Sequence, residues 1–505
     1  MVSLAMEMAA SRLLGNYFGT SNLVWASIIG LILIYLTAGY FLGGTWADRS
    51  PKHITFFKIL AWAAMATGLI PIIARPILRL AANAFDNLQM GVLVGSFTSV
   101  MILFIIPVTL LGMASPFAIH LSIRDAASAG KVSGRIYAIS TLGSFVGTFL
   151  PVLILIPTIG TYRTFLVIGT ILLIFALAGI YLVSSWKGLL PFIWMPVIFI
   201  LLYLFGTPGT DKDTTGMIYE GESAYNYIQV LQQDDTTLLR LNEGQGVHSI
   251  YNPNTYLYNG PWEQVLSAPF FNKAPISPME IETAAIIGLA GGTTSRELFA
   301  VFPNIHVDGI EIDAEIVDVG LQYFAMANPN LNIIVQDGRW ALEKSSQTYD
   351  IISIDAYRPP YIPWHMTTQE FFQSVYSHLT PSGVMVINIG RGPQDRRLVD
   401  ALATTIQTVF PTIYISDLAG SFNTLLFATR QTTELDNYLA NYVQLMNDPT
   451  TPPQLLAVMA TTYEGLQPLP EPSKIIFTDD RAPVEQITNS IIVNFLLSGE
   501  TEALE

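Results

Sequence analysis

The chain has 505 residues, of which 51% are hydrophobic and only 12% are charged, and its mean hydropathy is +0.44. This length exceeds that of one typical domain, and this composition excludes a protein that is soluble throughout. The chain contains no cysteine, which excludes disulfides, thiolate zinc sites and cysteine nucleophiles. Its six histidines are scattered without the paired spacing typical of metal ligands, so no metal site is predicted.

Charge divides the chain into two parts. Residues 1–206 contain 11 Lys and Arg against 4 Asp and Glu, a net charge of +7. Residues 207–505 contain 13 Lys and Arg against 35 Asp and Glu, a net charge of −22. The first part is apolar and predicts a membrane domain, whereas the second predicts an acidic soluble domain. Because an acidic domain repels phosphate backbones, we expect no nucleic-acid partner.

Apolar stretches fill the first part of the chain. A helix needs about 20 apolar residues to cross the hydrocarbon core of a bilayer. Stretches near this length lie at 23–46, 54–75, 90–118, 136–158, 164–184 and 188–206. A shorter apolar stretch runs from Met1 to Leu14, either as a half-helix or because the true start lies upstream. Residues 1–206 are therefore expected to form a polytopic α-helical domain of six or seven segments in the cell membrane.

Basic residues in the loops predict an orientation in the membrane. They follow the second, fourth and sixth of seven segments, so these loops lie on one side, which should be cytoplasmic. The residues are Arg49, Lys52, Arg124, Lys131, Arg135 and Lys187. Seven segments would then place the acidic domain outside the cell. The reaction considered below uses a cytoplasmic metabolite and favours a domain that faces the cytoplasm, so the two indications conflict.

Two regions are expected in the acidic part. Residues 215–282 contain short alternating runs, such as YNYIQVLQ and TTLLRLN, which predict a small β-hairpin region. In residues 283–505 apolar strands alternate with helices, beginning with AAIIGL, TSRELFAVF, HVDGIEID and AEIVDVGLQYF. This alternation predicts a Rossmann-like, doubly wound parallel sheet, in which ligands bind at the carboxyl ends of the strands.

Glycines and carboxylates follow four successive predicted strands. They are Gly288, Gly291 and Gly292 after the first strand, Glu311 at the end of the second, Asp337 and Gly338 after the third, and Asp355 after the fourth. Glu311 lies about 20 residues beyond the glycine turn, where a ribose-binding carboxylate belongs. Four such strand ends favour a nucleoside site, and ordinary turns with acidic helix caps are the alternative.

The chemistry of these strand ends restricts the ligand. The turn reads G-x-x-G-G, which is neither a phosphate-binding P-loop nor the dinucleotide motif G-x-G-x-x-G. Carboxylates rather than Arg or Lys line the strand ends, so a nucleoside bearing positive charge fits better than one rich in phosphate. An S-adenosyl sulfonium has this character, with Glu311 taking the ribose hydroxyls and Asp337 the adenine amino group.

These residues resemble the polyamine aminopropyltransferases (spermidine synthases), and most closely a bacterial branch in which a multi-helix membrane part precedes the synthase domain. The resemblance covers essentially the whole chain. In the first part it rests on SRLLGNYFGTSNLVW, GYFLGGTWADR, LLGMASPFAIHL and GRIYAISTLGSFVGT. In the second part it rests on ESAYNYIQV, NEGQGVHSIY, GLAGGTTSREL, GIEID, QDGRWAL, IDAYRPPYIP and TDDRAPVE.

The resemblance implies a reaction and its residues. An aminopropyl group passes from decarboxylated S-adenosylmethionine, a co-substrate, to a small-molecule amine such as putrescine, with release of methylthioadenosine and no prosthetic group. By the resemblance, Asp355 is the catalytic carboxylate, and Glu311 and Asp337 bind the nucleoside. Asn226 stands where the family usually has Gln, beside Tyr225, in contact with the donor. A second copy of the chain is a candidate partner.

The acceptor side departs from the family pattern. The acidic loop, usually D-S-S-D-P or D-S-T-D-P, here reads D-A-Y-R-P, so Arg358 replaces the second acid. An arginine there repels a diamine, unless it points to solvent or pairs with an acid such as Asp480. The family's Y-x-E helix motif keeps only its acid. The candidate substrate-binding residues of this rebuilt side are Tyr225, His248, Glu263, Tyr357 and Arg358.

Three hypotheses stay open at this point. The first is the membrane-anchored aminopropyltransferase, and the second is an S-adenosylmethionine-dependent methyltransferase, which must also accept the donor's carboxylate. The third is a transporter-like membrane protein with a non-catalytic nucleoside-binding domain. His365, just beyond the acidic loop, is either a lid residue over the site or a packing residue beside Trp364.

Overall fold

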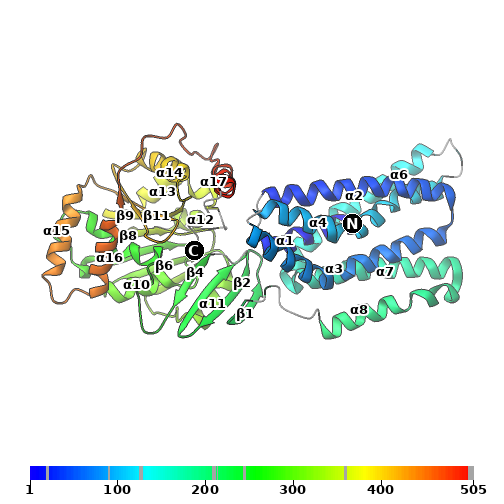
Figure 1. Ribbon diagram of the computed structural model, residues 1–505, viewed down its shortest axis with the longest axis horizontal. Coiled ribbons are helices and arrows are strands. Elements are labelled where there is room, and N and C mark those ends of the chain that lie inside the picture. The colour runs from blue at the N-terminus through cyan, green and yellow to red at the C-terminus, as the bar shows by residue number, and fades with distance from the viewer. Residues whose placement is uncertain are drawn as a thin grey trace. The chain divides into compact units, whose positions relative to one another are not determined.

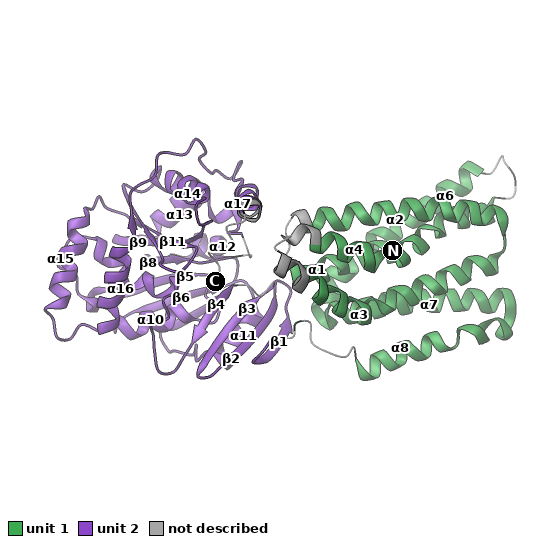
Figure 2. Ribbon diagram, viewed as in Figure 1, with its two compact units in different colours: residues 1–213 green, residues 214–505 purple. Residues whose placement is uncertain are grey.

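The computed structural model describes residues 1–18, 22–88, 91–123, 125, 129–206, 212, 214–242, 246–357 and 361–498. The chain divides into two compact units, residues 1–213 and residues 214–505 (Figure 2). Among the described residues, all strands of the two sheets lie in the second unit (Figure 1).

The first unit consists of helices. They are α1 (Val2–Phe18), α2 (Asn22–Arg49), α3 (His53–Leu88), α4 (Gly91–Gly112), α5 (Ala114–Ser122), α6 (Ala129–Leu150), the π-helical turn η2 (Pro151–Leu155), α7 (Ile156–Leu189), the 3-10 turn η3 (Leu190–Phe192) and α8 (Trp194–Phe205). Glycines allow α2 to approach α4 closely: a β-carbon on Gly39 would lie 2.4 Å from the carbonyl oxygen of Thr109.

The helices differ in number from the expected membrane segments. Among the described residues, four stretches are long and apolar enough to cross a membrane: Val24–Arg49, His53–Ala81, Gly95–Ser122 and Ala129–Phe192. The expected spans 136–158 and 164–184 fall in one run of 64 residues, broken where Gly160 and Ser185 adopt positive φ. Within the expected span 188–206, the helix α8 has only 12 residues and a length of about 18 Å, which is too short to cross a bilayer.

A small antiparallel sheet begins the second unit. Its order is β1-β2-β3-β4, formed by β1 (Met217–Glu222), β2 (Tyr227–Gln233), β3 (Thr236–Leu241) and β4 (Val247–Tyr251). The sequence predicts a β-hairpin region here, and the structure extends it to four strands. Leu239, Ile228 and Val230 of this sheet pack against Ile316 and Phe324 of the larger domain.

The large sheet has eight strands in the order β12-β10-β11-β9-β8-β5-β6-β7. They are β5 (Thr283–Ile287), β6 (His306–Glu311), β7 (Leu331–Val335), β8 (Tyr349–Ile354), β9 (Leu379–Gly390), β10 (Thr412–Asp417), β11 (Asn423–Thr429) and β12 (Leu466–Gln467). From β9 to β7 neighbouring strands are parallel, so the predicted Rossmann-like fold is confirmed. The strands β10 to β12 extend it with antiparallel pairings that the sequence did not predict.

Helices cover both faces of the large sheet because each central strand is apolar on both sides. In β5, Ala285 and Ile287 pack on one face, whereas Ala284 and Ile286 pack on the other. The first face is covered by α12 (Gly338–Lys344), α13 (Gln369–Ser377), α14 (Arg397–Gln407) and α17 (Val484–Ser498). The second is covered by the 3-10 turn η4 (Val265–Phe271), α10 (Thr293–Val301), α11 (Ala314–Tyr323), α15 (Leu435–Met446) and α16 (Pro453–Glu464).

Candidate nucleoside and amine site

Four neighbouring strands deliver the predicted residues to one edge of the large sheet. The strands β8, β5, β6 and β7 lie side by side and parallel, so their carboxyl ends meet there. The backbone of Asp355 donates a hydrogen bond to the carbonyl of Ile287, and that of Gly288 donates to Ile310. The glycine turn, Glu311, Asp337 and Asp355 are therefore brought to the same edge.

The glycine turn after β5 requires residues without a side chain. Gly288 has φ of 94°, and a β-carbon there would lie 2.5 Å from the carbonyl oxygen of Asp355. Gly292 has φ of 78° and begins α10. Gly291 donates its N–H to the hydroxyl of Ser249 on β4, at 2.8 Å. The turn is thus fixed between the large sheet and the small one.

Glu311 holds the turn through its carboxylate. Oε2 accepts a hydrogen bond from the N–H of Ala290 at 2.9 Å, and Oε1 accepts one from the N–H of Asp313 at 3.1 Å. The side chain is buried, and burial raises the pKa of Glu311 to about 7, although these backbone donors act in the opposite direction. Glu311 therefore changes charge close to neutral pH.

Asn226 contacts Asp313, a residue close to Glu311 that the sequence analysis did not select. Its Nδ2 donates to Oδ2 of Asp313 at 2.9 Å, and its Oδ1 accepts from Asn242 at 2.9 Å. Asp313 is buried and caps α11 at its N-terminus. The only sequence signal for Asp313 was an acid at the start of a predicted helix. Contact of Asn226 with a donor stays a prediction.

Asp337 begins α12 and contacts a histidine from a distant loop. Its Oδ1 accepts from the N–H of Trp340 at 3.0 Å, and its Oδ2 lies 3.0 Å from Nε2 of His365. His365 thus touches the predicted adenine-binding acid, which supports a role at the site beyond packing against Trp364. Gly338 follows Asp337 and brings α12 close to β5, because a β-carbon there would lie 2.4 Å from Ile287.

Asp355 lies at the end of β8 and is held by a neighbour on β9. Nδ2 of Asn388 donates to its Oδ1 at 2.9 Å. Burial raises the pKa of Asp355, although this hydrogen bond opposes the shift. The hydroxyl of Tyr357 donates to the carbonyl of Asn388 at 3.1 Å and accepts from the N–H of Gly390 at 2.8 Å. Tyr357 therefore ties the Asp355 loop to β9.

A small pocket opens beside Asp355. Its lining residues come from α9 (Pro261–Gln264), η4, α10, β8, β9 and β11, and they are Pro261, Trp262, Val265, Thr294, Ser353, Ile354, Asp355, Val386, Asn388 and Leu425. The lining is apolar apart from two hydroxyls, one amide and one carboxylate. Its volume is about 10 Å³, which is room for about one water molecule.

The remaining predicted residues lie around this edge in different roles. Burial lowers the pKa of His248 to about 4, so this side chain on β4 is neutral at neutral pH. Tyr225 is 49% exposed before β2. One carboxylate oxygen of Glu263 accepts from the N–H groups of Gly260 and Tyr258, so this acid caps α9. Arg358 lies outside the described residues, and with it the suggested pair with Asp480.

Arg296 on α10 joins the parts of the site, and the sequence analysis did not select it. Its guanidinium donates to the carbonyls of Gly291 at 2.9 Å, Phe324 at 2.7 Å and Ile250 at 2.5 Å. It also lies 5.1 Å from the centre of the Tyr251 ring. One half-buried cation therefore connects the glycine turn, the end of α11 and the strand β4.

Glu297, the neighbour of Arg296, is a buried acid without a hydrogen-bond partner among the described residues. It is 1% exposed, and both its carboxylate oxygens are buried. Burial, followed by repulsion from Glu263, raises the pKa of Glu297 well above its ordinary value of 4.5. The folded protein therefore keeps a proton that the unfolded chain loses. The free energy of unfolding should fall as pH rises from about 4.5 through the folded-state pKa.

Replacing Glu297 by glutamine should remove this fall in the free energy of unfolding at higher pH. We expect Glu297→Gln to melt several degrees above the wild type at about pH 8, and to match it at about pH 4.5, since a shift of roughly 2–4 °C accompanies each kcal/mol. The control Glu464→Gln, on the exposed surface of α16, should follow the wild type at every pH. Parallel melting curves for Glu297→Gln and the wild type across this range would show that Glu297 is ionised in the fold.

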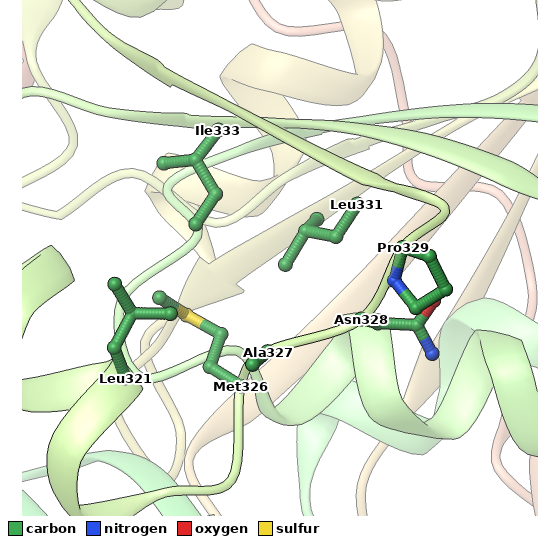
Figure 3. A pocket seen from close by; sticks show the side chains of 7 residues that line it. All are labelled: Leu321, Met326, Ala327, Asn328, Pro329, Leu331 and Ile333. Atoms are coloured by element: carbon green, nitrogen blue, oxygen red, sulfur yellow. The ribbon is translucent and has the colours of Figure 1, made fainter.

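A larger pocket of about 360 Å³ lies at the start of β7. Figure 3 shows its lining, which is formed by Leu321, Met326, Ala327, Asn328, Pro329, Leu331 and Ile333. These side chains include no ionisable group, and none of them is a predicted site residue. A cationic nucleoside needs polar partners, so the strand ends remain the candidate site.

Part of the second unit matches a known family model. Residues 271–418 match the model of the spermine/spermidine synthase domain. The match includes the glycine turn, Glu311, Asp337, Asp355 and Asn388, whereas Tyr225, Asn226, His248 and Glu263 precede it.

Several relatives of this chain are named as aminopropyltransferases, whereas others, among them a bovine protein 29% identical over 154 residues, are named as eEF1A lysine and N-terminal methyltransferases. A probable polyamine aminopropyl transferase of Bifidobacterium longum is 32% identical over 292 residues, which are 54% of this chain and 62% of that protein. A polyamine aminopropyltransferase of Vibrio vulnificus is 28% identical over 231 residues, 43% of this chain and 73% of that one. A solved probable spermidine synthase of Corynebacterium glutamicum is 18% identical with a TM-score of 0.39, over 52% of this chain and 99% of that one. The chain thus spans less than two thirds of the Bifidobacterium protein.

Proposed function

We propose that the chain is a membrane-anchored polyamine aminopropyltransferase. It transfers the aminopropyl group of decarboxylated S-adenosylmethionine to an amine such as putrescine and releases methylthioadenosine. One observation carries the proposal: Glu311, Asp337 and Asp355 stand at the ends of three parallel strands around a glycine turn, inside the matched synthase domain.

The donor half of the proposed site suits a cationic nucleoside. The carboxylate of Glu311 would accept the ribose hydroxyls in addition to its contacts with the turn, and that of Asp337 would accept the adenine amino group. Because His248 is neutral at neutral pH, it adds no positive charge beside a donor that carries a sulfonium and an ammonium. The net negative charge of residues 207–505 also favours a cationic donor.

The proposed chemistry needs one proton acceptor. An alkylammonium has a pKa near that of lysine, about 10, so at neutral pH its nitrogen has no free lone pair. Asp355 would hold this ammonium, take one proton and aim the lone pair at the carbon beside the sulfonium. The new N–C bond forms as the C–S bond breaks, and the bonding pair leaves with sulfur as the neutral thioether. The raised pKa of Asp355 makes it a stronger proton acceptor than an exposed carboxylate.

The first unit is proposed as the membrane anchor. Four apolar stretches of sufficient length support this, as do apolar side chains on the surface of the unit, such as Leu33, Phe41 and Leu182. The donor is a cytoplasmic metabolite, so we propose that the catalytic unit faces the cytoplasm, against the loop charges. Reporter fusions after Glu505 would test this: cytoplasmic activity supports it, and periplasmic activity contradicts it. A homodimer stays a prediction, to be tested by the mass of the detergent-solubilised protein.

A turnover assay tests the proposed function. The full chain, purified in detergent, is incubated with decarboxylated S-adenosylmethionine and a series of amines that begins with putrescine. Release of methylthioadenosine that requires an amine is the expected result. Absence of release with every amine, from a protein that still binds the donor, would refute the transferase and favour a binding module.

A further inference from the structure

The stretch TDDRAPVE near the C-terminus folds back toward the predicted donor side of the site. The backbones of Thr478 and Arg481 exchange hydrogen bonds of 3.0 and 2.9 Å, which places Asp479 in a tight turn. Just before this turn, the carbonyl of Phe477 accepts from the first N–H of α13 at 2.8 Å. The turn is therefore held beside the start of α13, and it lies beyond the matched family model, which ends at residue 418.

Arg339 on α12 joins this turn to a second loop. Its Nη1 and Nη2 donate to Oδ1 and Oδ2 of Asp479 at 2.7 and 2.8 Å, the two-point geometry that a guanidinium forms with a carboxylate. Nη1 also donates to the carbonyl of His365 at 3.1 Å, and Nε donates to Glu343 at 2.9 Å. The side chain of Arg339 is 19% exposed, and its hydrogen bonds hold the pKa of Asp479 below the ordinary value. The ion pair is therefore partly shielded from solvent and present at neutral pH.

Asp479 also holds the segment that follows His365. Its Oδ1 accepts from the hydroxyl of Thr368 at 2.7 Å, and its N–H donates to Oε2 of Glu370 at 3.0 Å. Thr368 is buried, and its hydroxyl also accepts from the N–H of Phe371 at the start of α13. Together with Arg339, Asp479 therefore fixes the segment 365–370 at both of its ends.

The ring of His365 reaches the predicted adenine-binding acid. Its Nε2 lies 3.0 Å from Oδ2 of Asp337, which stands two residues before Arg339. An ionised carboxylate can only accept, so we assign a hydrogen to Nε2. Oδ1 of Asp337 accepts from the N–H of Trp340 at 3.0 Å. Two donors from different segments therefore fix the plane of this carboxylate, and each of its oxygens keeps a second lone pair for a ligand.

We propose that His365, Arg339 and Asp479 are positioning residues of the donor site: Arg339 and Asp479 hold the loop of His365, and the ring of His365 orients Asp337 toward the 6-amino group of adenine. This inference rests on the proposed function and adds three residues to its donor half. In this arrangement the three residues act on the donor through Asp337. They determine specificity for the base, because a purine without a 6-amino group loses the hydrogen bond to Asp337.

A pair of nucleosides tests this role without turnover. Methylthioadenosine carries the 6-amino group, and its 6-deamino analogue lacks only that group. The wild-type full chain in detergent should bind the analogue about 10- to 100-fold more weakly, because the analogue cannot form a hydrogen bond to a charged acceptor. Titration calorimetry measures the two Kd values on the same preparation.

The variants His365→Leu and Asp479→Asn should remove most of this difference. We expect the Kd of methylthioadenosine to rise about tenfold and the Kd of the analogue to stay at the wild-type value, since only the first ligand uses the orientation of Asp337. His365→Gln keeps an N–H donor in reach of Asp337 and should keep the difference. The matched control Glu471→Gln, an exposed acid in the same C-terminal segment, should leave both Kd values unchanged.

Other outcomes of the binding test would overturn the inference. Equal weakening of both nucleosides in His365→Leu and Asp479→Asn would show that these residues only support the fold. Wild-type affinities in both variants would show that they do not act on the donor site. A wild type that binds both nucleosides equally would show that Asp337 does not accept from the 6-amino group.

The inference and the proposed function can fail separately. If the wild type transfers aminopropyl groups and the variants keep its preference for methylthioadenosine, the positioning role is refuted and the function stands. If the wild type forms no product with any amine, the function is refuted. Loss of the preference in His365→Leu and Asp479→Asn, with its retention in His365→Gln, would still uphold the positioning role at a nucleoside site.

Discussion

Asp355→Asn should lower kcat for aminopropyl transfer by about 10²- to 10⁴-fold, while donor binding stays close to the wild-type level. Asparagine keeps an oxygen that can accept from Nδ2 of Asn388, so the loop should retain its position. What it loses is the capacity to take a proton from the ammonium. Methylthioadenosine release and donor Kd measured on the same preparation separate these effects.

The pH dependence of transfer should show which protonation state of Asp355 is active. Only the ionised carboxylate of Asp355 accepts a proton, so kcat/KM for amine should rise with pH through the raised pKa of Asp355. The control Asp318→Asn changes an exposed acid on α11 and should leave the profile unaltered. A wild-type rate in Asp355→Asn would place the proton acceptor elsewhere.

Glu311→Gln should weaken donor binding by about 10- to 100-fold, because a carboxylate that accepts two hydroxyl hydrogen bonds is replaced by a neutral amide. Glutamine also presents one N–H₂ group toward the N–H of Ala290 or Asp313, which both donate to Glu311 in the wild type. Titration calorimetry with the donor measures this change. Glu282→Gln, an exposed acid at the opposite end of β5, is the matched control.

Donor affinity should also depend on pH through Glu311. Its folded-state pKa of about 7 lies above its ordinary value of 4.5, so the group takes up a proton as pH falls through neutrality. The ionised form binds the cationic donor better, and the Kd of the wild type should therefore rise up to about tenfold for each pH unit below 7. This dependence should vanish in Glu311→Gln. An equal pH dependence in both proteins would assign it to another group.

The sequence predicts the strand ends well because their signals are local. The alternation of apolar strands and helices predicts the parallel core, and each acid directly follows its strand. The turn at Gly288 is readable because only glycine permits both its φ of 94° and the close carbonyl of Asp355. Capping by Asp337 likewise follows from its place at the start of α12.

Contacts between distant segments could not be read in this way. Asn388 and Asp355 are 33 residues apart, His365 and Asp337 are 28 apart, and Asn226 and Asp313 are 87 apart. Each pair depends on strand order, which hydrophobic periodicity does not contain. The same limit hid the antiparallel strands β10 and β11, whose apolar character suits a parallel or an antiparallel neighbour equally.

The predicted membrane segments show a different limit. The predicted spans 136–158 and 164–184 leave a gap at the polar residues Thr161, Tyr162 and Arg163, and the helical geometry is interrupted at Gly160, inside that gap. The π-helical turn at Pro151–Leu155, by contrast, lies inside the predicted span 136–158, where apolar length gives no signal of it.

The mass of the amine product tests the central claim most directly. The full chain is incubated with putrescine and an equal mixture of decarboxylated and intact S-adenosylmethionine, and the acceptor is analysed by mass spectrometry. The account predicts an acceptor that has gained an aminopropyl group, formed in equal amount with methylthioadenosine and lost in Asp355→Asn. A methylated acceptor formed together with S-adenosylhomocysteine would contradict it and establish a methyltransferase.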